Sequence, residues 1–130
     1  MAIYVAIMCG IFAILNNNDL VVTSEVMKNA FDKGMRRGPE FSTLNSVSIK
    51  AVMGFHRLAI NGLDEISHQP IHVGNITLIC NGEIYNYKQL YELLPHDVKP
   101  QTNSDCEVIA HLYQAFGIDT TLQLLDGVFS

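Results

Sequence analysis

Residues 8–15 read MCGIFAIL, an apolar run that contains one thiol and one glycine. Because Met8 directly precedes Cys9, cleavage after Met8, or translation that begins there and loses its methionine, makes Cys9 the first residue. A terminal cysteine combines a nucleophilic thiolate with an α-amine that titrates at about 7.7–8.0. The two groups define an N-terminal nucleophile, which carries its own base. The competing interpretation is an ordinary buried strand, since free cysteine is among the most buried residue types.

The composition indicates one globular domain. The chain has 130 residues, of which 48% are hydrophobic. A folded chain of this length buries roughly two-thirds of its unfolded surface, enough for a sizeable core. The 13 acidic and 8 basic residues give a net charge of −5, which disfavours binding to nucleic acid or to an anionic membrane. We therefore expect neither a nucleic-acid partner nor a membrane partner.

The cysteines and the N-terminal apolar run indicate a cytoplasmic protein. Cys9, Cys80 and Cys106 make an odd count without the spacing of a zinc knuckle, so we expect reduced thiols and no metal. Cys80 and Cys106 are expected to pack in the core. The run from Ala2 to Leu15 lacks the basic start of a signal peptide and is shorter than the roughly 18 residues of a membrane span. Export or lipid anchoring is the less favoured alternative.

Hydrophobic periodicity predicts an alternation of strands and helices. Strands are expected at residues 3–15, 47–53, 56–60, 76–80 and 128–130. Helices are expected from Thr23 or Ser24 to residue 37, at 87–94, at 104–116 and from Thr120 or Thr121 to Leu125. Glycine and proline mark the helix ends, because glycine permits a left-handed cap and proline cannot continue a helix. The last strand begins just before residue 130, so we expect a domain that is cut short.

Asn81-Gly82 stands between two apolar runs and has two interpretations. Asn-Gly in that setting is the strongest short signal for a type I′ hairpin turn. Alternatively, the asparagine amide and the Gly82 N–H aim two donors at one developing oxyanion. Glu83 then places an acceptor beside the same site. The residues alone leave both interpretations open.

Arg57 and Asp105 could hold the two ends of an amino acid, although each also has a simpler role. The Arg57 guanidinium could bind a carboxylate through two parallel hydrogen bonds, or it could lie at a strand edge. Asp105 could bind an ammonium group, or with Ser104 it could cap the helix that follows. A nucleophile, oxyanion donors and two such clamps together indicate attack on the side-chain amide of glutamine or asparagine.

Short motifs follow one another along the chain. They are MCGIFAIL at 8–15, RGP at 37–39, GFHRLAI at 54–60, QP at 69–70, NGEIYNY at 81–87, TNSDCE at 102–107 and LDGVF at 125–129. In this order they resemble the class II glutamine amidotransferase domain of glutamine-hydrolysing asparagine synthetases, an N-terminal nucleophile hydrolase. NGEIYNY favours asparagine synthetases over the sugar-phosphate and phosphoribosyl amidotransferases of the same class.

The resemblance implies a mechanism and a substrate, glutamine. Cys9 would attack the side-chain amide and release ammonia, and water would hydrolyse the resulting thioester to glutamate. Asn81 and the Gly82 N–H would form the oxyanion hole. The implied substrate-binding residues are Arg57 at the α-carboxylate, Asp105 and Glu83 at the amine and amide ends, and the backbone of Leu58, Ala59, Ile60 and Asn61 along the pocket.

The resemblance also implies a fold and a partner. The family fold is α+β, a four-layer αββα sandwich, expected here without its C-terminal strands. Residues 1–8 would be an N-terminal extension or a misassigned start, and residues 9–130 a partial amidotransferase domain. The ammonia would pass to a synthetase domain that uses ATP and Mg²⁺ to activate aspartate. That domain is expected on another chain or lost, because no Ser-Gly-Gly pyrophosphate loop occurs here, and no cofactor is expected in this chain.

Besides the missing synthetase domain, two departures from the family pattern matter. Glu40 stands where the motif usually has aspartate. Residues 1–7 precede the expected start, so Cys9 has a free amine only if they are absent or removed. If they remain, the alternative function is that of an inactive remnant or a glutamine-binding module with a blocked nucleophile.

Overall fold

The computed structural model describes residues 9–15, 22–59 and 62–130. The chain divides after Ala59 into two compact units. Both contain helix and antiparallel strand pairs, which makes the chain α+β, as the sequence predicts. Residues 3–8 of the first predicted strand, and the predicted pocket residues Ile60 and Asn61, lie outside the described residues.

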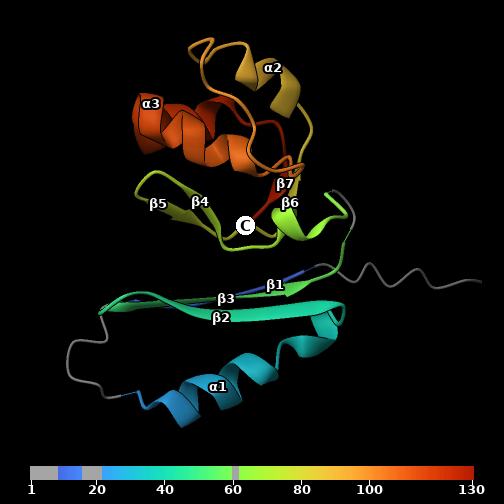
Figure 1. Cartoon of the computed structure of the whole chain (residues 1–130), viewed down its shortest axis with the longest axis vertical. Helices are drawn as coiled ribbons and strands as arrows, with labels where there is room; N and C mark the ends of the chain where they lie inside the picture. The colour runs from blue at the N-terminus through green and yellow to red at the C-terminus, as the bar shows by residue number, and fades with distance from the viewer. Residues whose placement is uncertain (1–8, 16–21, 60–61) are drawn as a thin grey trace, which may run out of the picture. The chain divides into compact units, whose positions relative to one another are not determined.

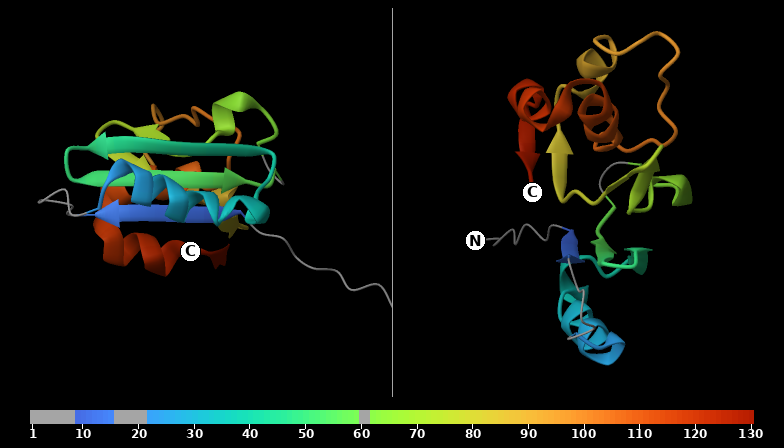
Figure 2. Two further views of the ribbon diagram at one scale, coloured as in Figure 1. Left: turned by 90° about the horizontal axis from the view of Figure 1, so that it is seen from below. Right: turned by 90° about the vertical axis from the view of Figure 1, so that its left-hand side faces the viewer.

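The first unit is, over its described residues, a three-stranded antiparallel sheet with a helix on one face (Figures 1 and 2). In chain order its elements are β1 (Gly10–Leu15), α1 (Ser24–Asp32), the 3₁₀ helix η1 (Met35–Arg37), β2 (Phe41–Ser48) and β3 (Ala51–Arg57). β3 is the central strand. The register pairs Gly10 with His56 and Phe41 with Arg57. The residues just before β1 and β2 and those just after β3 therefore lie at one edge of the sheet.

Helix α1 packs on the sheet through Phe31, which is 6% exposed. The Phe31 ring meets the Phe12 ring edge-on at 5.8 Å between centroids. A side chain at Gly54 would collide with the Phe31 ring, so the glycine lets the helix approach β3. Thr23 caps the helix as the sequence predicts, because its Oγ1 accepts a hydrogen bond from the Val26 N–H at 3.3 Å.

The strand predicted at 47–53 is wrong, because the chain turns in its middle. β2 ends at Ser48 and β3 begins at Ala51. Ile49, in the turn, is 97% exposed. Alternation of apolar residues can continue across a two-residue turn, so periodicity alone does not reveal the hairpin.

The bounds of β3 and of helix α1 also differ from those that the sequence predicts. β3 runs through Gly54 to Arg57 without interruption, so no separate strand begins at residue 56. The predicted helix to residue 37 is broken, since α1 ends at Asp32 and η1 follows. Residues 38 and 39 end the helical segment as expected, because η1 ends just before them.

The second unit contains, over residues 62–130, a hairpin, a second strand pair and two α-helices (Figure 1). In chain order its elements are the 3₁₀ helix η2 (Glu65–Ser67), β4 (Ile71–Val73), β5 (Ile76–Leu78), β6 (Gly82–Ile84), α2 (Tyr87–Tyr91), α3 (Glu107–Leu124) and β7 (Gly127–Phe129). β4 pairs with β5 and β6 pairs with β7. The predicted strand at 76–80 is thus confirmed in part as β5, whereas β4 is too short for its alternation to be recognised.

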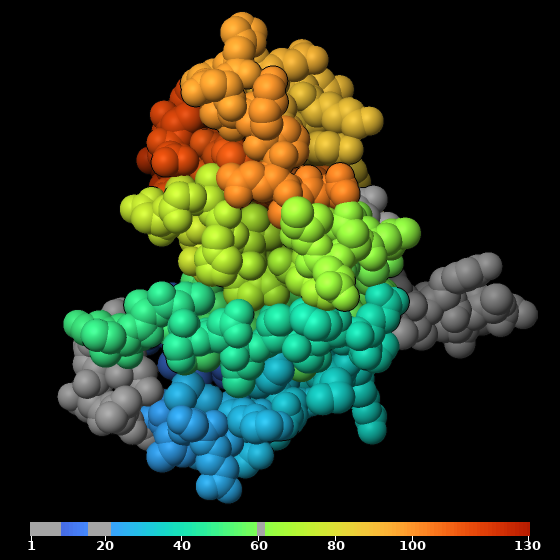
Figure 3. Space-filling view, in the orientation of Figure 1, coloured from blue at the N-terminus to red at the C-terminus, as the bar shows by residue number. Residues whose placement is uncertain are grey.

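Helix α3 contributes buried residues to both core clusters of the second unit. Gly117, with φ 76° and ψ 174°, breaks it into two helical pieces, as the sequence predicts. Val108 and Leu112 of α3 belong to a buried cluster with Cys80, Ile84, Leu90, Leu94 and Cys106. The β4–β5 hairpin packs on Ala110 of α3 through Ile71 and Val73, next to the α3 region in Figure 3. Within the described ranges, no helix combines the length and the apolar character of a membrane span.

Gly38→Ala should destabilise the first unit by about 2 kcal/mol or more, since overpacking against backbone cannot relax cheaply. A Cβ on Gly38 would stand far inside van der Waals contact with the His56 carbonyl. Gly10→Ala is the matched control, because its Cβ would meet the side chain of the same His56 at 3.3 Å. Urea denaturation of both variants checks this, and equal losses of stability would contradict it.

Candidate active site

The Cys9 thiol lies against the backbone of Leu58, at the sheet edge where β1 begins and β3 ends. The thiol donates a hydrogen bond to the Leu58 carbonyl oxygen at 3.2 Å and accepts one from the Leu58 N–H at 3.2 Å. Arg37 Nε donates to the Cys9 carbonyl oxygen at 3.3 Å. Cys9 itself is partly exposed and precedes β1. It is therefore not the buried strand cysteine of the competing interpretation.

Glu40 holds the segment that follows β3. Its N–H donates to the Arg57 carbonyl oxygen at 3.2 Å, and its Oε2 accepts from the Ala59 N–H at 2.9 Å. Both contacts flank Leu58, the residue that holds the thiol. Sequence reasoning noted Glu40 only as a departure from aspartate. The signal that could have identified it is its position directly after the RGP motif.

Arg57 and His56, adjacent in β3, are both buried. Arg57 is 6% exposed, which fits a guanidinium shielded from water. The His56 ring stacks on Phe31 at 3.9 Å between centroids. Its Nδ1 bonds Ser42 Oγ at 2.7 Å and its Nε2 bonds the Phe31 carbonyl oxygen at 2.8 Å. Both ring nitrogens are therefore engaged, and they tie β3 to β2 and to helix α1.

In the second unit, one edge of β6 pairs with β7 and the backbone of the opposite edge contacts Asp105. Asn81 exchanges two backbone hydrogen bonds with Ser130, at 3.0 and 2.9 Å, on the β7 side. In an antiparallel pair, the N–H groups of successive residues point to alternate edges. Gly82 and Ile84 therefore direct their N–H groups away from β7. The Ile84 N–H donates to Asp105 Oδ2 at 2.6 Å, so the Gly82 N–H points to the same edge as this carboxylate.

The type I′ hairpin at Asn81-Gly82 does not form. β6 begins at Gly82 and pairs with β7, far along the chain, while β5 pairs with β4. A Cβ on Gly82 would collide with the backbone of Val128. Glycine is required here by the close approach of β7. The Asn81 and Glu83 side chains are partly exposed.

Asp105 does not cap helix α3. It is 5% exposed, and its carboxylate binds the Ile84 N–H as described above. Ser104 instead accepts a hydrogen bond from the Cys106 N–H through Oγ at 3.3 Å. The Cys106 thiol, 2% exposed, donates to the Gly82 carbonyl oxygen at 3.7 Å. Asp105 and Cys106 thus tie the start of α3 to β6.

Cys80 and Cys106 are packing residues, as the sequence predicts. Cys80 is 4% exposed and belongs to the same apolar cluster as Cys106. The hydrogen bond with Cys80 and burial raise the pKa of the Cys106 thiol far above its ordinary value. A thiol that stays protonated is a poor nucleophile, so Cys106 is not a candidate for a nucleophile.

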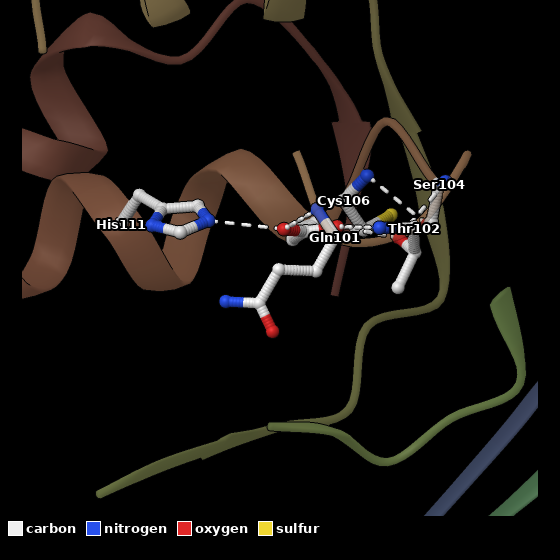
Figure 4. Close-up of polar contacts among 6 residues, drawn as sticks. Gln101, Thr102, Ser104, Cys106 and His111 are labelled. Atoms are coloured by element: carbon white, nitrogen blue, oxygen red, sulfur yellow. Dashed lines mark hydrogen bonds and ion pairs between the residues drawn. The ribbon is translucent and has the colours of Figure 1, made fainter. Parts of the chain in front are cut away.

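Two buried polar side chains that sequence reasoning missed hold backbone near the site residues of the second unit. Gln69 donates from Nε2 to the Cys80 carbonyl oxygen at 2.9 Å and accepts from the Cys80 N–H at 2.6 Å. Glu107 is 0% exposed and accepts hydrogen bonds from residues 101, 102 and 111, as Figure 4 shows. The signals were present in the QP and TNSDCE motifs, each of which contains one of these residues.

Burial raises the pKa of the Glu107 carboxyl, but hydrogen bonds outweigh it. The Thr102 hydroxyl, the Gln101 N–H, His111 and the Thr102 N–H together hold the pKa below its ordinary value. Glu107 is therefore a carboxylate at neutral pH.

Other features do not point to a second site. Among the described residues, no cluster of three or more histidine, cysteine or acidic side chains could hold a metal. A hollow of about 390 Å³ lies between α2 and residues 94–100. It is lined by residues such as Tyr87, Tyr91 and Val98 and by none of the predicted site residues.

The predicted site residues fall into two groups, one in each unit. The first unit holds Cys9, Arg57, Leu58 and Ala59. The second unit holds Asn81, Gly82, Glu83 and Asp105. The contacts described above join Cys9 to Leu58 in the first group and connect the backbone of β6 to Asp105 in the second.

The first unit holds a positioned thiol and a buried guanidinium, and in the second unit a buried carboxylate lies at the edge of β6. The chain belongs to the glutamine amidotransferase domain family, whose model matches residues 8–130.

Its relatives are synthetases. The chain is 39% identical over 132 residues to the glutamine-hydrolyzing asparagine synthetase of Rattus norvegicus. This alignment covers 95% of the chain and 22% of the relative. It is 39% identical over 127 residues to glutamine-hydrolyzing asparagine synthetase 1 of Arabidopsis thaliana, and 40% identical over 127 residues to the enzyme of Asparagus officinalis. Each of these two alignments covers 95% of the chain and 21% of the relative. The chain thus spans about a fifth of the length of the curated relatives it matches.

Glu107→Gln should flatten the loss of stability in acid. A carboxyl whose folded pKa is lowered stabilises the fold above its unfolded value of about 4.3, and this contribution is lost as the pH falls through the lower folded value. Thermal unfolding of both proteins between neutral and acidic pH measures the effect. The exposed Glu92→Gln is the control and should behave as the parent does. A parallel decline in parent and Glu107→Gln would contradict the assignment.

Proposed function

We propose that this chain hydrolyses glutamine to glutamate and ammonia with Cys9 as an N-terminal nucleophile. The observation that carries the proposal is the bonding of the Cys9 thiol by both backbone groups of Leu58, at an accessible sheet edge. Within residues 9–15, 22–59 and 62–130, no side-chain base is a hydrogen-bond partner of this sulfur. The base would be the α-amine of Cys9 itself, once residues 1–8 are gone.

Hydrolysis would proceed through a thioester on Cys9. The α-amine takes the thiol proton, and the thiolate attacks the side-chain amide carbon of glutamine. The Asn81 amide and the Gly82 N–H would donate to the oxyanion that forms. As the C–N bond breaks, the α-ammonium returns its proton to the leaving nitrogen, which departs as ammonia. Water then attacks the thioester, which yields glutamate and the free thiol.

Glutamine would be selected by charge at its α-carbon. Arg57 would bind the α-carboxylate, and its burial would strengthen this pairing by removing competing water. Asp105 would bind the α-ammonium and Glu83 the amide end. The backbone at Leu58, Ala59, Ile60 and Asn61 would line the pocket. The Gly82 N–H and the Asp105 carboxylate share one edge of β6, which supports their use on one substrate.

The names of the relatives suggest a use for the ammonia. We propose that it serves the synthesis of asparagine from aspartate, in a synthetase domain that uses ATP and Mg²⁺. No step in this chain requires either. We also propose the four-layer αββα sandwich of N-terminal nucleophile hydrolases as the complete fold, and a cytoplasmic location, in keeping with the free thiols of all three cysteines.

The role of the free amine can be tested by one inserted residue. A chain that begins at Met8, from which aminopeptidase removes the methionine, should release glutamate from glutamine. The same chain with an alanine inserted between Met8 and Cys9 keeps the thiol but loses the adjacent amine, and should be inactive. Intact mass establishes the first residue of each protein, and a coupled assay measures glutamate.

Two outcomes would decide otherwise. Equal activity of the inserted variant would remove the α-amine from the mechanism, and activity in Cys9→Ala would exclude the thiol. Binding of glutamine without hydrolysis, in a chain that begins at Cys9, would favour a glutamine-binding module.

Arg57→Ala should chiefly weaken glutamine binding, by about 2–5 kcal/mol for a buried charge pair that loses one partner. The expected result is a large rise in KM with a smaller change in kcat. Arg36→Ala, at an exposed arginine in η1, is the control and should leave both constants unchanged. An unaltered KM in Arg57→Ala would remove Arg57 from its assigned role.

A further inference from the structure

Glu107 is an unusually well-coordinated buried carboxylate. Its Oε1 accepts from the Gln101 N–H at 2.7 Å and from His111 Nε2 at 3.0 Å. Its Oε2 accepts from the Thr102 N–H and the Thr102 hydroxyl, both at 2.6 Å. In Figure 4, the dashed contacts run between His111 at one end and Thr102 at the other. Glu107 thereby fixes the segment that leads into α3.

The network continues from Thr102 towards Asp105. The Thr102 hydroxyl donates to Glu107 and accepts from the Ser104 N–H at 3.1 Å, and the Ser104 hydroxyl accepts from the Cys106 N–H at 3.3 Å. The two residues that flank Asp105 are thus both held. Asp105 in turn binds the Ile84 N–H at 2.6 Å. The position of the Asp105 carboxylate relative to β6 therefore depends on this chain of bonds.

We propose that Glu107 is a positioning residue that sets the selectivity for the substrate's α-ammonium group by holding Asp105 in place. The inference rests on the proposed function, in which Asp105 binds that ammonium. It assigns no contact between Glu107 and substrate. The same network would also favour glutamine over a glutamine analogue that has no α-amino group.

The negative charge of Glu107 is essential to this role. All four of its partners are donors, and an ionised carboxylate has only acceptor sites. In Glu107→Gln, an amide NH₂ replaces one of the two acceptor oxygens. This NH₂ can only donate, so it cannot accept the hydrogen bonds that its neighbours offer. The segment from 101 to 104 must then move, although the side chain has the same size. Thr102→Val removes the hydroxyl relay with little change in volume, whereas Thr102→Ser keeps it.

The test measures binding, by calorimetry, of L-glutamine and of its des-amino analogue glutaramate. Each substitution is made in the chain that begins at Met8 and loses this methionine, with Cys9→Ala, which prevents turnover. Glu107→Gln should lower the affinity ratio of glutamine to glutaramate by about tenfold or more, the range for one charge-assisted hydrogen bond. Asp105→Asn should abolish the preference. Glu92→Gln and Thr102→Ser should keep it.

Each outcome separates the possible causes. If Glu107→Gln fails to fold, Thr102→Val against Thr102→Ser gives the same comparison. An equal loss of affinity for both ligands, or an unchanged ratio in Glu107→Gln and Thr102→Val, overturns the inference, because a purely structural role would act on both ligands alike. If Asp105→Asn removes the preference and the Glu107 and Thr102 variants do not, only this inference fails. If the Cys9→Ala chain binds no glutamine, the proposed function fails and the inference fails with it.

Discussion

The antiparallel register of β1 on β3 is the constraint on which the first group of site residues depends. Because Gly10 stands opposite His56, continuing the register puts Cys9 opposite Arg57, and the Cys9 sulfur meets both main-chain groups of the next residue, Leu58. A slip by one residue would turn every side chain of β1 to the other face of the sheet. His56 fixes β3 in this register, since its buried ring stacks on Phe31 and both ring nitrogens are bonded.

In the second unit, buried polar side chains organise backbone rather than contact one another. Gln69 binds both backbone groups of Cys80, Asp105 binds the Ile84 N–H, and Glu107 binds two successive amides. Each such hydrogen bond adds only a modest net stabilisation when it forms. Breaking one is costly in free energy, because a buried polar group is then left without a partner. They hold the edge of β6, where the Gly82 N–H points, in a fixed relation to the start of α3. A preorganised edge of this kind suits the binding of a small charged substrate.

The sequence points to residues that can be recognised by their own type and their immediate neighbours. It does not reveal residues whose role depends on a partner far along the chain. Cys9 could be singled out as a candidate because a thiol after a methionine is informative in itself, and the break at Gly117 could be predicted because glycine ends helices. The type I′ hairpin, one of the two interpretations of Asn81-Gly82, does not form because the partner of β6 is β7, which local turn signals cannot indicate. Glu40 and Gln69 were missed as backbone clamps because their targets lie 19 and 11 residues away, a spacing that no local pattern specifies.

The central claim is that the Cys9 sulfur forms a covalent bond with glutamine during turnover. Rapid mixing of the processed chain with glutamine, an acid quench and peptide mass spectrometry test this most directly. The account predicts a glutamyl thioester on Cys9 that forms before glutamate accumulates and decays as glutamate is released. Steady glutamate release with Cys9 unmodified throughout, or a glutamyl adduct on Cys80 or Cys106 instead, would contradict it.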